Sequence, residues 1–134
     1  MAKQKQTKLC PCTSGLPPVQ CCQPLLNNEQ PAETAVALMR SRYSAYTLGD
    51  ESYLLRTWHS TTRPAQLDLN NNQQNWQRLK IIDSTAGRAD DDSGEVEFVA
   101  IYKIKGRAER LHERSRFGRE DQQWRYIDGL ILTE

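Results

Sequence analysis

Four cysteines near the start of the chain are the residues whose type and spacing most directly suggest chemistry. One residue separates Cys10 from Cys12, and Cys21 and Cys22 are adjacent; the 134 residues contain no other cysteine. Four thiolates can surround one ion as a tetrahedron, with sulfur at about 2.3 Å, which is the geometry of structural Zn²⁺ sites. Pro11 fixes a bend that allows both members of the first pair to point at the same ion.

The eight residues between the two cysteine pairs return the chain on itself, because they contain the turn formers Ser14-Gly15 and Pro17-Pro18. Four protein ligands leave no coordination position for water or substrate, so such a site is structural. Its binding energy would fold a segment that cannot build a core of its own. We therefore predict a structural Zn²⁺ cofactor held by Cys10, Cys12, Cys21 and Cys22.

Three other uses of the cysteines have to be weighed against zinc. Disulfides between adjacent cysteines, or across one residue, strain the backbone and are rare in a reducing compartment. A redox dithiol usually has two residues between its cysteines, and that spacing is absent here. An iron–sulfur cluster also takes four thiolates and stays open as an alternative.

Composition and charge bear on the compartment and on the classes of partner. The formal net charge is +1, so we expect no general attraction to nucleic acid or to an anionic membrane. The apolar runs, such as 99–101, are far too short to span a bilayer. The basic residues after Met1 lead directly to the cysteines without the apolar stretch of a signal peptide, so we expect a cytoplasmic protein.

The residues after the cysteines predict helices first. Residues 32–48 should form a helix, with Pro31 at its start, Gly49 at its end and a buried stripe that includes Tyr43 and Tyr46. Asp50 can cap a shorter helix that carries Tyr53, Leu54 and Trp58. Pro64 is expected to open a third helix with Leu67 and Leu69, which the polar run 70–74 ends.

From Trp76 onward the apolar period changes to two, which predicts strands. The expected strands are 76–82, 95–105, 109–119 and 124–132, with a polar loop over 83–94. Short turns between them indicate an antiparallel meander. Because 95–105 has apolar residues on both faces, we expect helices on one face, and a second subunit or the cysteine segment on the other.

The chain also resembles known proteins. Residues 10–15 followed by Cys21-Cys22 resemble the SEC-C zinc motif, and the downstream segments resemble the YchJ family of bacterial proteins, over 38–46, 53–54, 57–59, 63–64, 96–100, 113–117 and 124–129. The resemblance implies a SEC-C motif over residues 1–26. It also implies a nuclear-transport-factor-2-like α+β domain over 30–134, in which a curved antiparallel sheet wraps around N-terminal helices in a cystatin-like cone. It implies no particular activity.

Two departures from the SEC-C motif matter. Thr13 stands where the motif commonly has glycine, and residues 16–20 lack the lysines that the motif commonly carries. Those lysines help SEC-C motifs contact acidic partners. Docking of that kind is therefore in doubt for this chain.

A cone-shaped fold often encloses an apolar pocket with a few polar groups. Our candidates for such a pocket are Tyr43, Tyr46, Trp58, His59, Arg63, Glu113, Arg114, Arg116 and Asp128. His59 can act as an acid or base oriented by Asp128, or it can simply bond to nearby backbone. The aromatic residues suit a core better than a ligand cage, and the arginines of 107–119 suit salt bridges with interleaved acids better than phosphate binding.

Two classes of function follow from these features. No catalytic motif is visible, so we favour a protein-binding adaptor that docks a protein partner through its zinc knuckle, with a possible homodimer through the sheet. The alternative is a small-molecule-binding or isomerase- or hydratase-like enzyme that uses the cone pocket.

Overall fold

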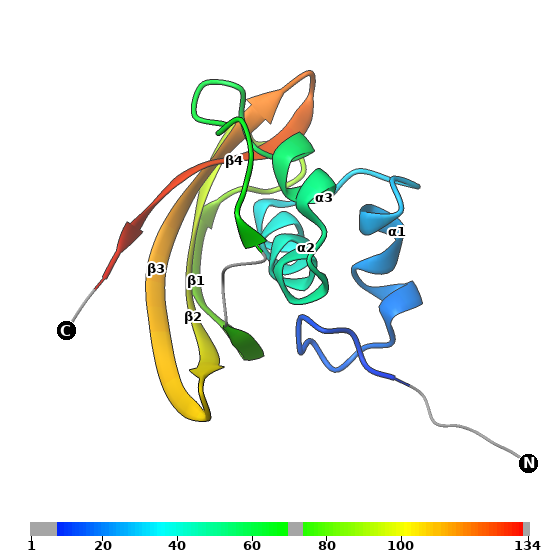
Figure 1. Ribbon diagram of the computed structural model, residues 1–134. Helices are drawn as coiled ribbons and strands as arrows, with labels where there is room; N and C mark the ends of the chain where they lie inside the picture. Colours follow the sequence, from blue (N-terminus) through cyan, green and yellow to red (C-terminus); the bar gives the residue numbers. More distant parts are fainter. Residues whose placement is uncertain (1–7, 70–73, 133–134) are drawn as a thin grey trace, which may run out of the picture.

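The computed structural model describes residues 8–69 and 74–132, and Figure 1 shows the arrangement of their helices and strands. The elements are η2 (Pro18–Gln20), α1 (Gln23–Leu26), α2 (Ala35–Leu48), α3 (Glu51–Arg56), β1 (Asn75–Ala86), β2 (Ser93–Ile104), β3 (Arg107–Glu120) and β4 (Gln123–Ile131). The helical elements precede the strands, which confirms the α+β class. No helix among the described residues is long and apolar enough to cross a membrane.

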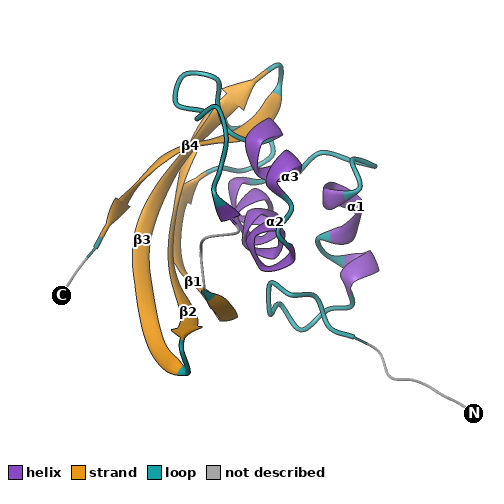
Figure 2. Cartoon of the chain, in the orientation of Figure 1, coloured by secondary structure: helices purple, strands orange, loops and turns teal. Residues whose placement is uncertain are grey.

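The strands form one antiparallel sheet in the order β1-β2-β3-β4, so the predicted meander is confirmed. The sheet curves around α2, as Figures 1 and 2 show. Irregular pairing in β1, between Trp76 and Arg78 and between Ile81 and Asp83, accompanies this curvature, and β4 is offset between Arg116 and Phe117 of β3. Such bulges bend a strand and increase its twist.

The polar loop predicted over 83–94 is wrong for half of its length. β1 continues to Ala86 and β2 already starts at Ser93, so only a short connection separates them. The outward-facing positions of an antiparallel sheet take polar residues, and this explains why a polar stretch resembled a loop. Gly87, with φ +75°, sits where an added Cβ would lie 2.9 Å from Cβ of Ala35, so this hairpin closely approaches the start of α2.

α2 starts three residues later than predicted. The hydroxyl of Thr34 accepts a hydrogen bond from the Ala37 amide at 3.0 Å, so Thr34 caps the helix and Pro31 lies outside it. The end is as predicted, because Gly49 takes a left-handed conformation with φ 72°. A side-chain cap outweighs proline here because it satisfies an amide that the first turn leaves unpaired.

The predicted cap of α3 is confirmed, since the Asp50 carboxylate accepts a hydrogen bond from the Tyr53 amide at 3.1 Å. Trp58 lies beyond α3 and forms a parallel bridge with Tyr126 instead. The helix predicted from Pro64 is wrong, because residues 64–68 have no helical structure. The polar run expected to end it falls largely on 70–73, which are outside the described residues.

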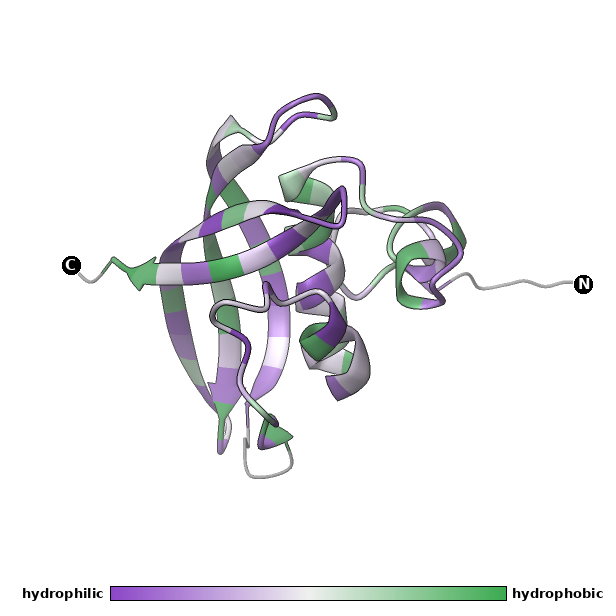
Figure 3. Ribbon diagram, turned by 90° about the horizontal axis from the view of Figure 1, so that it is seen from above, coloured by the Kyte–Doolittle hydropathy of each residue, from purple (hydrophilic) through white to green (hydrophobic). Residues whose placement is uncertain are grey.

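The main core lies between α2 and the concave face of the sheet. Its buried members include residues from α2, from the strands and from the cysteine segment: Cys10, Cys12, Cys22, Ala35, Leu38, Met39, Tyr43, Leu79, Val96, Phe98, Ala100, Phe117 and Trp124. Hydrophobic and hydrophilic residues alternate along the strands in Figure 3. The cysteine segment lies on the helix side of the sheet (Figure 1), so it does not cover the other face, contrary to one of our two expectations.

Candidate metal centre

The four cysteines form two pairs separated by eight residues, and the pairs come together at one point in space. Their sulfur atoms all lie within 4.8 Å of one another. Sγ of Cys21 lies 3.4 Å from Sγ of Cys12 and 3.8 Å from Sγ of Cys22. A tetrahedral ion with metal–sulfur bonds of about 2.3 Å spaces its ligands about 3.8 Å apart. The cluster can therefore hold one metal ion with little rearrangement.

Local backbone bonds bring the two pairs together. The Cys10 amide donates to the Leu16 carbonyl at 2.8 Å, and the Thr13 amide donates to the Cys10 carbonyl at 3.0 Å, which closes a turn around the first pair. Gly15 has φ 91° and continues the turn. Cys21 directly follows η2 and Cys22 directly precedes α1, so the second pair lies between these two short helices.

Polar neighbours surround three of the sulfur atoms. The Ser44 hydroxyl lies 3.7 Å from Sγ of Cys10, and the Ser14 hydroxyl lies 3.2 Å from Sγ of Cys21. Nη1 of Arg40 lies 3.9 Å from Sγ of Cys12 and 3.5 Å from its carbonyl oxygen. Four thiolates around a divalent ion leave a net charge of −2, and donors of this kind offset it. Arg40 and Ser44 come from one face of α2, one turn apart.

The thiols also perturb one another. The hydrogen bond from the Cys22 thiol lowers the pKa of Cys12 to about 4, although burial opposes this shift. The same bond raises the pKa of Cys22, and burial raises the pKa of Cys21. Metal binding has to displace the protons of the thiols that are still protonated, so the affinity for a metal ion depends on pH.

Thr13 joins the cysteine segment to the sheet. Its hydroxyl donates to the Leu79 carbonyl at 3.1 Å and accepts from the Leu79 amide at 3.0 Å. Its backbone has φ 62°, a conformation that glycine adopts at lower cost. The departure from glycine at this position thus coincides with two hydrogen bonds to β1 that glycine has no side chain to make.

A separate cavity of 230 Å³ lies between α2 and the concave face of the sheet. Most of its wall is apolar or aromatic, and the lining residues are Met39, Arg42, Tyr43, Tyr46, Gln74, Trp76, Phe98, Ala100, Leu111, Glu113, Ser115 and Tyr126. Of the candidate pocket residues, Tyr43, Tyr46 and Glu113 line this cavity. Burial raises the pKa of Tyr43 to about 12, so its hydroxyl is protonated at neutral pH.

Comparison with known proteins places this geometry in a family. The family model described as the YchJ middle NTF2-like domain matches residues 34–129. The chain belongs to the YchJ family. The matched range falls inside the 30–134 domain that we predict, and the exact boundaries stay a prediction.

Curated relatives of this YchJ-family chain match it over nearly its whole length. A UPF0225 protein from Chromobacterium violaceum is 48% identical over 134 residues, covering 98% of this chain and 99% of the relative. A UPF0225 protein from Streptomyces coelicolor is 48% identical over 126 residues, covering 94% of this chain and 98% of the relative.

Two solved structures share the fold. The solution structure of a SEC-C motif containing protein from Rhodopseudomonas palustris has a TM-score of 0.81 and 32% identity, covering 92% of this chain and 98% of that one. The crystal structure of a SEC-C motif containing protein from Psychrobacter arcticus has a TM-score of 0.71 and 28% identity, covering 96% and 84%. The expected nuclear-transport-factor-2-like fold is thereby confirmed.

The other candidate pocket residues of the YchJ-family chain do not line the cavity: Trp58, His59, Arg63, Arg114, Arg116 and Asp128. Strand parity places Arg114 and Arg116 on the convex face of the sheet, away from α2. There Arg116 forms a bidentate pair with Asp128 at 2.7 and 2.8 Å, and its hydrogen bond lowers the pKa of Asp128. Asp128 is thus committed to Arg116 and does not orient His59.

The imidazole of His59 bonds to nearby groups, which was the simpler of our two interpretations, and its backbone amide donates to the Tyr126 carbonyl at 2.7 Å. Its Nδ1 lies 3.2 Å from the amide of Thr61 and 2.9 Å from the hydroxyl of the same residue. Trp58 packs edge-to-face on Tyr126, with 5.0 Å between ring centroids, and so stands behind the cavity wall. Arg63 is exposed and lines a different hollow.

The arginines of β3 support the salt-bridge interpretation over phosphate binding. Arg114 contacts Glu95 at 2.6 Å, and both Asp83 and Glu97 at 3.2 Å. The pKa of Arg114 is raised, and the hydrogen bond to Glu95 contributes most to this rise. The guanidinium of this residue is therefore already surrounded by carboxylates.

Most of the cavity lining was not among our candidates, and Arg42 is the charged residue in that missed part. It is buried, its Nη1 donates to the Leu54 carbonyl and to the Thr57 hydroxyl at 2.8 Å each, and its guanidinium lies 4.5 Å from the Tyr126 ring centroid. Burial lowers its pKa. The helical period carried the signal, since Arg42 stands one turn from Tyr46 on the buried stripe of α2.

Proposed function

We propose that this YchJ-family chain is a zinc-binding adaptor, in which Cys10, Cys12, Cys21 and Cys22 hold a structural Zn²⁺ and the outer surface of the knuckle docks a protein partner. The support for zinc is the set of four thiolates at tetrahedral spacing, which closes the coordination shell. A closed shell leaves no position for a reacting group, so the metal has a structural role. The proposal is for binding and not for catalysis.

One observation carries the docking role: the cysteine segment exposes large apolar side chains. Leu9 is 59% exposed, Leu16 is 45% exposed and Val19 is 64% exposed. The hydrogen bond between Cys10 and Leu16 holds two of them on neighbouring stretches of chain. Apolar side chains held outward on a rigid knuckle fit a partner that covers them.

The same residues define the kind of contact. Because residues 16–20 contain no lysine, the docking surface has apolar residues where a SEC-C motif commonly has basic ones. Contacts of this type lose little strength as salt is added, in contrast to contacts between exposed charges. We therefore propose a partner with an apolar recognition segment and not an acidic one.

The experiment compares surface variants of the zinc-loaded chain in affinity capture from a lysate. Leu16→Ser combined with Val19→Ser should remove the captured partner, while Leu48→Ser, at an equally exposed position on α2, should retain it. Capture by the unchanged chain should persist at high salt. The proposal fails if the double variant or the zinc-free chain captures the same partner as strongly as the unchanged protein.

The cavity gives the enzyme alternative less support than the exposed apolar residues give to docking. An acid–base role for His59, Arg63 or Asp128 requires that they converge in the pocket, and none of the three lines it. Its wall is instead formed in large part by tyrosine and tryptophan rings, and Arg42 is held by bonds to Leu54 and Thr57. Docking is the function that the described residues support better.

A further inference from the structure

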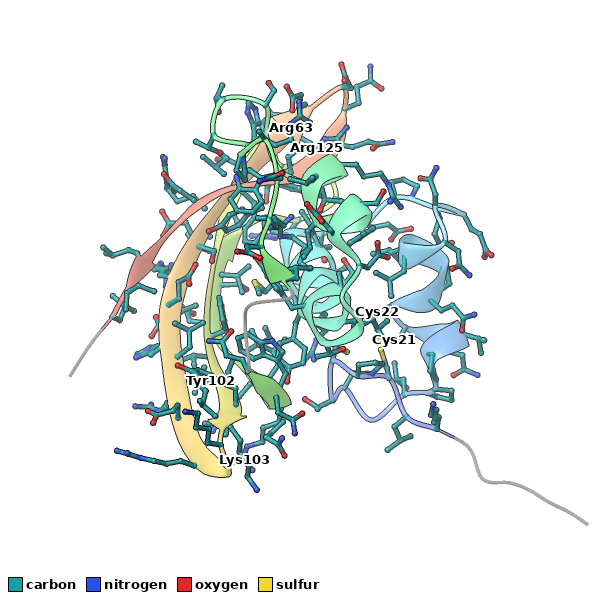
Figure 4. The ribbon with its side chains drawn as sticks, in the orientation of Figure 1. Cys21, Cys22, Arg63, Tyr102, Lys103 and Arg125 are labelled. Carbon is teal, nitrogen blue, oxygen red and sulfur yellow. The ribbon has the colours of Figure 1, made fainter. Side chains whose placement is uncertain are left out.

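A second hollow, of 290 Å³, shares no lining residue with the cysteine cluster or with the cavity between α2 and the sheet. Three arginines line it, Arg56 from α3, Arg63 from the following loop and Arg125 from β4, and no carboxylate of the described residues does. Figure 4 shows Arg63 and Arg125 close together, well away from Cys21 and Cys22. The three cationic side chains meet here although 69 residues of sequence separate Arg56 from Arg125.

Two of these arginines are held in place by the fold. Nη2 of Arg56 donates to the carbonyls of Leu25 and Leu26 at 3.4 Å, and its guanidinium lies 4.7 Å from the Tyr53 ring centroid. Nη1 of Arg125 donates to the Arg56 carbonyl, which couples the two residues directly. These contacts fix the positions of the guanidinium groups before any ligand arrives.

One of the arginines that line the hollow has an unmet hydrogen-bond donor. Nε of Arg125 is buried and has no hydrogen-bond partner among residues 8–69 and 74–132. Leaving a buried donor unpaired costs about 1–3 kcal/mol, and more for a charged group. Such a group in a native fold calls for an acceptor, and a bound anion would supply one.

The hollow also has unmet charge. Within the described part of the chain, none of the three arginines forms an ion pair, whereas Arg114 and Arg116 on the sheet each have carboxylate partners. The carboxylate of Glu120 forms hydrogen bonds with Ser60, which are the main reason for its lowered pKa, and the charge of Arg125 contributes a smaller share. Three like charges that line one hollow with no carboxylate of the described residues in its wall repel one another, and an anion among them reduces that cost.

We propose that this hollow is a binding site for a small phosphorylated ligand, with Arg56, Arg63 and Arg125 around the phosphoryl group. Guanidinium forks pair with two phosphate oxygens at once, and a phosphate carries −1.5 to −2 charges at neutral pH, more than a single carboxylate. The amides of Asn28, Gln30 and Gln123 line the same hollow and offer further donors. The indole of Trp124 gives the organic part of a phosphate monoester an apolar wall.

The test titrates the zinc-loaded chain with inorganic phosphate and with phenyl phosphate at constant ionic strength. Binding is followed by calorimetry and by the NMR signals of the arginine Nε–H groups. Both ligands should bind saturably and shift the Arg125 signal. Arg63→Gln should weaken binding about tenfold, the loss expected for one charge-assisted hydrogen bond. Arg63 is exposed, so this variant should keep the fold, which its far-UV circular dichroism will show.

Arg107→Gln supplies the matched control, since it removes the same charge at an exposed hairpin position far along the chain. It should leave the affinity within twofold of the unchanged protein. The proposal is overturned if phosphate acts no differently from chloride at equal ionic strength, or if Arg107→Gln weakens binding as much as Arg63→Gln. Tighter binding of succinate than of both phosphates would overturn the phosphoryl assignment.

Discussion

The polar neighbours of the cysteine cluster differ in charge, and this difference sets their expected importance. Ser14 and Ser44 are neutral, while Arg40 brings a full positive charge to within 3.9 Å of Sγ of Cys12. An ion held by four thiolates leaves excess negative charge in a largely buried place. Arg40 is thus the neighbour that most directly offsets the charge of the proposed zinc complex.

Replacing Arg40 by glutamine should lower the affinity for Zn²⁺ by roughly 10- to 100-fold, the usual effect of losing a partner just outside the metal ligands. Arg40→Lys should lose less, because it keeps the charge. Competition with a chromophoric chelator at pH 7 measures the affinity. Arg88→Gln, at an exposed position in the β1–β2 connection, is the control. Equal affinities for the Arg40→Gln and Arg88→Gln variants would rule out this role.

At the scale of elements, the approach of the β1–β2 hairpin to α2 fixes where the sheet meets the helix. The Ala35 amide donates to the Gly87 carbonyl at 2.9 Å, and the space beside Gly87 is too small for a methyl group. Gly106, in the β2–β3 turn, has a similar φ of 80° but open space around it. A comparison of alanine substitutions at Gly87 and Gly106 therefore separates the cost of backbone strain from the cost of steric contact.

Gly106→Ala should destabilise the fold by roughly 1 kcal/mol, the cost of a left-handed alanine. Gly87→Ala should cost about 2–4 kcal/mol, because it adds overpacking against Ala35 to the same backbone cost. Midpoints of urea unfolding for both variants, at unchanged slope, give the difference. Equal losses would mean that the hairpin can move away from α2 without penalty.

The elements that local sequence patterns specify were predicted well, and those that depend on distant contacts were not. The β2 alternation from Val96 to Ile104 and the Asp50 cap are local, and both are found in the structure. The helix expected at Pro64 is absent, and the Leu67 amide instead bonds to the Glu51 carboxylate at 2.8 Å, across 16 residues. A contact of that kind overrides a weak local preference.

The same distinction between local patterns and distant contacts applies to the residues of the candidate sites. The spacing of the cysteines predicted their convergence, because the eight residues between the two pairs contain turn formers that bring the pairs back together. Strand parity requires that Arg114 and Arg116 share one face, but which face meets α2 depends on the packing of the whole sheet. The gathering of Arg56, Arg63 and Arg125 had no local signal, since α3, a loop and β4 supply one residue each.

On the scale of the whole molecule, the knuckle and the main domain are one structure. Cys10, Cys12 and Cys22 belong to the same buried cluster as Leu38 and Phe98, and Thr13 bonds to β1. Metal binding should therefore stabilise the entire fold and not only the first residues. A ligand present at 1,000 times its dissociation constant contributes about 4 kcal/mol, enough to move the unfolding transition by many degrees.

The most direct measurement is a titration of Zn²⁺ into reduced, chelator-treated protein, with thermal unfolding followed by the fluorescence of the tryptophans, including the buried Trp124. The midpoint should rise in a single cooperative transition and stop rising at one Zn²⁺ per chain. A midpoint that does not respond to Zn²⁺, or that saturates at another ratio, would contradict a metal centre built into the core of this domain.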